Sequence, residues 1–196
     1  MRRTILCALL LSTLWLSSVA FAQEPAATLH QGATQLEVFA AGGNGFGKRS
    51  STHFFYAGGR WGKVLTGQHL GGPLRGNLEF AVDVIPLYAI FEPPVNAFGA
   101  GFNPIILKWN FISGKRMAPF AELGGGVLFT NHDVPVNTNN VNFVPQGGFG
   151  IHFFTKPKRA VTVSAKYLHV SNAGLEFRNS GVNASIQVLV GYTWFR

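Results

Sequence analysis

The stretch from residue 167 to residue 175 brings together the side chains best able to do chemistry. His169 and Ser171 are two positions apart, and residues two apart on a β-strand point to the same face. A histidine beside a serine can take the hydroxyl proton and make the serine a nucleophile. Asparagine side chains and glycine amides nearby could stabilise an oxyanion. The pattern predicts serine-dependent ester chemistry; a pair of interfacial polar residues at a strand end is the alternative.

The elements that must position this pair are β-strands. Apolar and polar residues alternate over stretches of roughly ten residues, separated by clusters of glycine, proline and asparagine, and this alternation predicts half-buried strands. No apolar run after residue 22 is long enough for a helical membrane span. Eight strands are expected, at residues 34–42, 52–64, 76–86, 97–111, 118–130, 142–155, 160–171 and 182–195.

The strand face that carries His169 and Ser171 is otherwise apolar. Its other members are Val161, Val163, Ala165 and Tyr167. An apolar outer face and a polar inner face are typical of a transmembrane barrel, because strands can cross a bilayer only as a closed barrel. Polar groups on a lipid-facing wall are costly and therefore suggest function. The predicted fold is all-β, an eight-stranded antiparallel transmembrane β-barrel, with a soluble lipocalin-type barrel as the alternative.

Composition narrows the class of protein. The 196 residues are 47% hydrophobic and only 12% charged, with 24 glycines and 18 phenylalanines, which argues against a disordered chain or a coiled coil. The formal net charge is +8. The basic residues are diluted among apolar ones, so an anionic lipid surface is favoured over nucleic acid as the partner.

The first 22 residues have the pattern of a secretory signal peptide. Arg2 and Arg3 precede an apolar stretch at residues 5–16, and Ala20-Phe21-Ala22 forms a small-x-small cleavage site. An N-terminal membrane anchor is the alternative. The only cysteine, Cys7, lies in this segment, so the expected barrel domain, residues 23–196, has no disulfide or thiol chemistry. The scattered histidines lack ligand spacing, so no metal or other cofactor is expected.

The sequence motif around His169 and Ser171 resembles that of a known family. The chain reads His169-x-Ser171-Asn-Ala-Gly-Leu and continues with Asn179-x-Gly-x-Asn183. This run, about residues 167–183, resembles the lipid A 3-O-deacylase family, also described as acyloxyacyl hydrolases. The resemblance implies a small outer-membrane barrel with a Ser-His-acid triad on its lipid-facing wall, which removes an ester-linked 3-hydroxyacyl chain from lipopolysaccharide.

Carried over onto this chain, the resemblance assigns a role to each residue. Ser171 is the nucleophile and His169 is the general base. Asn172, Gly174 and Asn179 are candidates for oxyanion support.

The third member of the triad is ambiguous. Asn183 stands where several family members have the triad glutamate, and an asparagine can orient a histidine without stabilising the imidazolium as a carboxylate does. Strand alternation places Asn183 on the inner face unless a bulge at the strand start reverses it. Glu176, in the connection between the last two strands, is the alternative acid.

The connections orient the barrel. With both ends of the chain periplasmic, the short connections at residues 113–116 and 156–159 face the periplasm, and longer polar ones at 43–51, 86–96, 131–141 and 172–181 face outward. The connection at 65–75 is long for a periplasmic turn. His169 and Ser171 then lie at the outward end of their strand, at the depth of the outer leaflet of a Gram-negative outer membrane.

The expected function is hydrolysis of a lipid A ester at this depth, without a cofactor. A groove between strands would hold the acyl chain, and Lys48, Arg49 or Arg178 would meet the phosphates. The expected partners are lipopolysaccharide and outer-membrane lipids, with no nucleic acid. A catalytically inactive barrel of structural, adhesin-like or porin-like type is the alternative.

Overall fold

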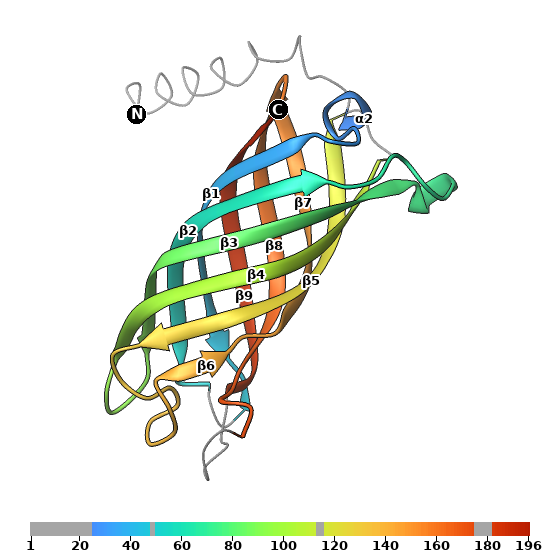
Figure 1. The fold of residues 1–196 in the computed structure, drawn as a ribbon. Coiled ribbons are helices and arrows are strands. Elements are labelled where there is room, and N and C mark those ends of the chain that lie inside the picture. The colour runs from blue at the N-terminus through green and yellow to red at the C-terminus, as the bar shows by residue number, and fades with distance from the viewer. Residues whose placement is uncertain (1–24, 48–49, 113–115, 175–181) are drawn as a thin grey trace, which may run out of the picture.

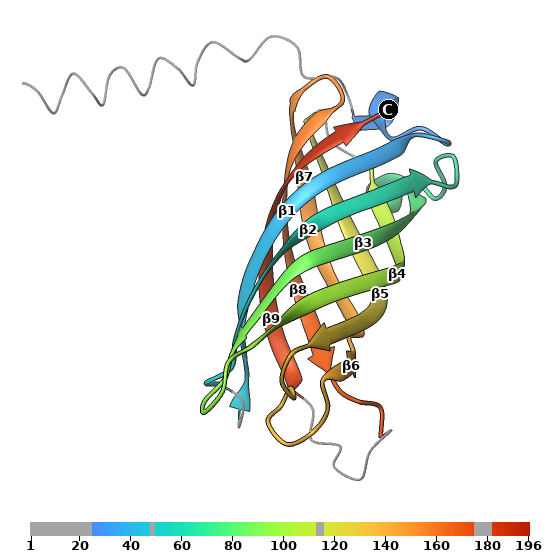
Figure 2. The same ribbon diagram turned by 60° about the vertical axis from the view of Figure 1, so that its left-hand side comes forward.

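The alternating segments of the sequence form strands that close into a barrel. The computed structural model describes residues 25–47, 50–112, 116–174 and 182–196. Neighbouring strands pair antiparallel in the order β4-β3-β2-β1-β9-β8-β7-β5-β6, and pairing of β4 with β5 closes the ring (Figures 1 and 2). The strands are β1 (Thr34–Gly45), β2 (His53–Val64), β3 (Gly76–Phe91), β4 (Ala97–Phe111), β5 (Met117–Thr130), β6 (Val141–Phe143), β7 (Gln146–Lys156), β8 (Arg159–Val170) and β9 (Val182–Phe195).

β6 and β7 are two parts of one strand. Val127 of β5 pairs with Phe143 of β6, and Leu123 of β5 pairs with Gly147 of β7, so the register stays in step across the gap. Pro145 lies in this gap, and a proline cannot donate a ladder hydrogen bond. The barrel therefore has eight strands, and the predicted fold class is confirmed.

β3 runs further than the sequence predicted. Pro86 suggested the end of a strand, yet β3 continues to Phe91. The register between β3 and β4 shifts between Ile85 and Tyr88, and a bulge of this kind can accept a proline within a strand. The outward connection expected at 86–96 is therefore only 92–96.

The two ends of the barrel differ. The C-terminus, the one-turn helix α2 (Pro25–Thr28) and the connection between β7 and β8 lie at one end, here called the turn end. The connections from β1 to β2, β3 to β4 and β5 to β6 lie at the other, here called the loop end (Figures 1 and 2). The long connection at 65–75 contains the short 3-10 helix η2 (Gly72–Leu74) and a bridge between His69 and Gly76.

Apolar residues close the turn end. Leu29, directly after α2, is fully buried, and its carbonyl accepts a hydrogen bond from the Asn77 side chain at 2.5 Å. No helix in the described part of the chain is long and apolar enough to cross a membrane. The cluster that closes this end is Leu29, Ala33, Val64, Ile112, Ala118, Phe154, Ala160 and Phe195.

The middle of the barrel interior carries paired charges. They are Arg60–Asp83 at 2.6 Å, Arg60–Glu122 at 2.7 Å, Lys166–Glu122 at 2.6 Å and Lys108–Glu79 at 2.9 Å. Buried charges are tolerated when each has a partner. A second apolar cluster, which includes Phe39, Tyr56 and Leu168, fills the interior toward the loop end.

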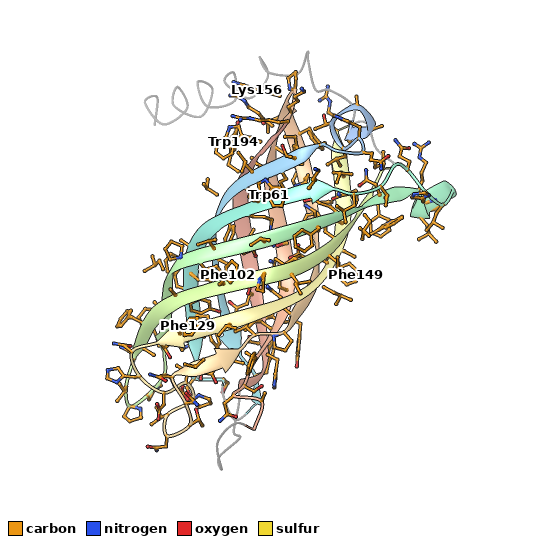
Figure 3. The ribbon with its side chains drawn as sticks, in the orientation of Figure 1. Trp61, Phe102, Phe129, Phe149, Lys156 and Trp194 are labelled. Atoms are coloured by element: carbon orange, nitrogen blue, oxygen red, sulfur yellow. The ribbon has the colours of Figure 1, made fainter. Side chains whose placement is uncertain are left out.

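The outer wall is apolar, as the alternation predicted. Trp61, Phe102, Phe129 and Phe149 are exposed and project from the wall (Figure 3). A lipocalin-type barrel would place its apolar residues around an internal cavity instead. Apolar outside and charged inside is the pattern of a transmembrane barrel. The predicted signal peptide, residues 1–22, lies outside the described residues.

Candidate active site

The end of β8 places His169 and Ser171 on the outer wall. Leu168 and Val170, the inward-facing residues of this segment, are buried in the barrel interior. His169 and Ser171 alternate with them and are half-buried. Tyr167, two residues before His169 and on the same face, is 50% exposed. The predicted shared face of His169 and Ser171 is therefore confirmed.

Backbone hydrogen bonds from the segment 143–145, which joins β6 to β7, hold His169 and Ser171. Ser171 lies just beyond β8, and it exchanges two hydrogen bonds with Phe143: Phe143 N–H donates to the Ser171 carbonyl at 2.8 Å, and Ser171 N–H donates to the Phe143 carbonyl at 3.1 Å. His169 N–H donates to the Pro145 carbonyl at 3.0 Å. The segment 143–145 thus fixes the spacing between the two candidate catalytic residues.

The chain turns sharply after Ser171. Asn172 is 2% exposed, and its side-chain oxygen accepts a hydrogen bond from Gly174 N–H at 3.1 Å. Ala173 and Gly174 both have positive φ, +54° and +78°, a conformation that glycine adopts without cost and alanine adopts only in special turns. The Asn172 side chain therefore shapes the turn that carries the backbone amides nearest to Ser171.

The β9 side of His169 is irregular. Leu168 pairs with Ser185 and Val170 pairs with Val182, so the two residues Asn183 and Ala184 stand opposite the single residue His169. This two-against-one count is a β-bulge, an irregularity that can reverse the face on which a neighbouring residue lies. The Asn183 side chain, Glu176 and Asn179 lie outside the described residues.

A large apolar groove on the outer wall includes His169 in its lining. It has a volume of about 860 Å³ and lies on the outer wall from β9 across β8, β7, β5 and β4 to β3. Two of the side chains that line it, Leu123 and Phe149, are 72% and 74% exposed. The other outward-facing residues that line it are Leu78, Leu107, Trp109, Ala121, Pro145, Gly147, Ala165, Tyr167 and Ile186, together with His169 itself.

Small residues form the floor of this groove. Gly147 pairs with Tyr167 on one side and with Leu123 on the other, so a position without a side chain lies between two large ones. The next row has the reverse order, with the large Phe149 between the small Ala165 and Ala121. A checkerboard of small and large outward residues therefore creates the depression, and larger residues at the small positions would fill it.

The sequence alone did not identify the groove residues. They come from six strands, and each looks like an ordinary lipid-facing residue in its own strand. The available signal was the small outward residue within an apolar face, at Ala121, Gly147 and Ala165, but only the register shows that these positions are adjacent. Lys48, Arg49 and Arg178, predicted to meet phosphates, lie outside the described residues.

The ionic network does not belong to this site. Glu122 and Lys166 lie on strands that line the groove. Their charged groups, however, pair with each other inside the barrel at 2.6 Å. Among the described residues no group of three or more His, Cys, Asp or Glu side chains could hold a metal ion.

The fold and the site together define a small transmembrane β-barrel of the outer-membrane type, with a His-Ser pair and an apolar groove on its outer wall. Within that class, the chain belongs to the lipid A 3-O-deacylase (PagL) family, whose family model matches residues 52–193. A search of curated proteins finds no match to this chain.

Solved outer-membrane barrels have the same fold. The crystal structure of the outer membrane enzyme PagL aligns with a TM-score of 0.56 and 21% identity, over 81% of this chain and 98% of that one. The N-terminal β-barrel domain of Pseudomonas aeruginosa OprF aligns with a TM-score of 0.51 and 13% identity, over 85% and 98%. OprG from the same organism gives 0.51 and 8%, over 90% and 99%.

Proposed function

We propose that this protein is an outer-membrane esterase that removes the 3-hydroxyacyl chain from the 3-O position of lipid A, with Ser171 as nucleophile and His169 as general base. The family is that of lipid A 3-O-deacylases. The observation that carries the proposal for this chain is the outer-wall groove whose lining includes His169, because an apolar groove beside a His-Ser pair suits an ester of a long acyl chain.

The direction of the groove fits a lipid substrate. From β8 to β3 it crosses four strand spacings, about 19 Å in all. Barrel strands tilt by about 40° from the membrane normal, so a path across them also descends along the barrel. His169 is at the loop end of β8, whereas Trp109 and Leu78 are near the turn end of β4 and β3. An acyl chain with its ester at His169 would therefore run down into the hydrocarbon layer.

The proposed reaction proceeds in two steps. Ser171 Oγ attacks the ester carbonyl carbon while His169 takes the hydroxyl proton. Collapse of the tetrahedral intermediate breaks the bond to the sugar oxygen, which receives that proton and leaves as a hydroxyl. Water then attacks the acyl-serine with His169 again as base, which releases the 3-hydroxy fatty acid and restores Ser171.

Asn183 is our candidate for orienting His169. The bulge in β9 sets its backbone opposite His169, and an amide side chain can hold a neutral imidazole by hydrogen bonding. Glu176 is the alternative, as a carboxylate reaching from the connection after β8.

Oxyanion support is proposed for Asn172, Gly174 and Asn179. In the described turn Gly174 N–H donates to the Asn172 side chain. A role for this amide therefore requires that the substrate oxygen replaces Asn172 as the acceptor.

The proposed location is the outer membrane, with the loop end and the candidate site toward the outer leaflet. The apolar wall supports a membrane setting, and the outer leaflet is where lipopolysaccharide acyl esters lie.

A purified-enzyme assay tests the proposal. The refolded barrel in detergent is incubated with lipopolysaccharide, and released fatty acids are identified by mass spectrometry. We expect free 3-hydroxy fatty acid from wild-type protein and none above background from Ser171→Ala. Equal release from both proteins would exclude Ser171 as the nucleophile.

A further inference from the structure

A polar cleft opens at the loop end, apart from the acyl groove. It has a volume of about 260 Å³ and lies between the connections 92–96 and 131–140. The residues that determine its chemistry are His132, Asp133, Asn137 and Asn140, with Val95 and Val136 as apolar contacts. The four polar residues are exposed, and their side chains make no hydrogen bond within the described part of the chain.

The connection that forms the cleft is held in one shape. Thr130 Oγ1 donates to the carbonyls of His132 at 2.8 Å and Asn140 at 3.1 Å, which closes the base of the connection. Val134 N–H donates to the Asn139 carbonyl at 2.9 Å. Val134 itself is buried in the apolar cluster at the loop end. The cleft is therefore preorganised, which lowers the entropy lost when a ligand binds.

The cleft is physically linked to the candidate active site. Asn140 is followed directly by β6, and three residues further on Phe143 pairs with Ser171. Three strand residues span about 10 Å. A molecule whose ester lies at Ser171 could therefore reach the cleft with the part that extends out of the membrane.

The lining selects an uncharged polar ligand. It contains no lysine or arginine, the residues that bind phosphate, and Asp133 would repel an anion. A calcium ion takes six to eight oxygen ligands, and this cleft offers one carboxylate. Asparagine amides both donate and accept hydrogen bonds, which matches sugar hydroxyls, and the two valines can contact the C–H faces of a sugar ring.

We propose that the cleft between connections 92–96 and 131–140 is a saccharide subsite that binds uncharged sugar hydroxyls of lipopolysaccharide while its acyl ester lies at Ser171. This inference rests on the proposed function. It assigns recognition of the sugar part of the substrate to the connection before β6, and recognition of the acyl part to the outer-wall groove.

The kinetic test uses Asp133→Ala/Asn140→Ala, since neither side chain supports the fold. Its matched control is His53→Ala, whose ring contacts Asn44 Oδ1 at 2.6 Å between β1 and β2, outside the cleft. We expect the double variant to raise KM for lipopolysaccharide about ten-fold, the effect of losing two hydrogen bonds, with kcat unchanged. KM for 4-nitrophenyl 3-hydroxydecanoate, an ester without sugar, stays at the wild-type value. An unchanged KM for lipopolysaccharide, or an equal rise for both esters, would overturn the proposal.

A binding measurement separates this inference from the deacylase proposal. Delipidated lipopolysaccharide saccharide is titrated calorimetrically into Ser171→Ala protein, with and without the two cleft substitutions. We expect about ten-fold weaker binding when the cleft is changed. Equal affinity overturns the saccharide subsite whether or not the wild-type protein hydrolyses lipid A. Absence of turnover by wild-type protein would instead count against the deacylase proposal.

Discussion

At the scale of single residues, the proposed deacylation requires His169 and Ser171 to act as one unit on the lipid-facing wall. Neither side chain fills the barrel interior, so truncation leaves no core cavity. We expect Ser171→Ala and His169→Ala each to reduce deacylation about 10⁴-fold or more, as in other serine hydrolases. The double variant should be little worse than either single one, because members of such a unit act non-additively.

Rates of fatty acid release from the three variants test this prediction. Heat-dependent migration in electrophoresis serves as the control that each barrel is folded. Multiplicative losses in the double variant would mean that the two residues act independently.

The third catalytic residue gives a second prediction at this scale. If Asn183 orients His169, Asn183→Ala should cost about 10²–10⁴-fold in rate. Asn183→Glu should be tolerated or faster, because a carboxylate stabilises the imidazolium. Glu176→Gln should then be mild. Initial rates for the three variants on one lipid A substrate decide between the two candidates. A damaging Glu176→Gln with a mild Asn183→Ala would assign the role to Glu176.

At the scale of elements, β6 is the segment that holds Ser171, the proposed nucleophile. Phe143 N–H donates to the Ser171 carbonyl, and a proline at position 143 removes that donor. We expect Phe143→Pro to lower kcat about 100-fold, since small displacements of catalytic groups have effects of this size, with little change in KM. Phe143→Leu keeps the N–H and should remain close to wild type. Equal kcat values for the two variants would show that this backbone pairing does not position Ser171.

The groove is an element-scale feature that can be filled without changing the reacting residues. Ala121 lies between Phe149 and Trp109 in the groove floor, so Ala121→Phe should obstruct the acyl chain and lower kcat/KM for lipopolysaccharide roughly ten-fold or more. Val38→Phe makes the same type of change on β1, at an exposed outer-wall position outside the groove. Kinetics of both variants test the assignment; equal effects would argue against an acyl chain in the groove.

At the scale of the whole molecule, alternation was enough to predict an eight-stranded barrel with an apolar wall. It also placed His169 and Ser171 on one face, because residues two apart share a face whatever the register. The groove depends on pairings such as Ala121 with Phe149. These pairings connect residues far apart in the chain, and the sequence of a single strand does not indicate them. The extension of β3 past Pro86 was missed because the bulge that accepts the proline is created by pairing with β4.

The filled interior also bears on what the whole molecule can do. Apolar clusters occupy both ends, and paired charges occupy the middle of the described barrel. An open aqueous channel of the porin type needs a wider interior than eight strands provide. The outer wall, rather than the interior, is therefore the surface on which this barrel would act.

Mass spectrometry of lipid A from Gram-negative cells that express this protein shows whether the protein removes an acyl chain from lipid A. Cells carrying wild-type protein are compared with cells carrying Ser171→Ala at the same level in the outer membrane. We expect wild-type protein to yield lipid A lacking one 3-hydroxyacyl chain, whereas Ser171→Ala should leave lipid A intact. Intact lipid A in both strains, with both barrels folded in the outer membrane, would contradict the assignment of this protein as a lipid A deacylase.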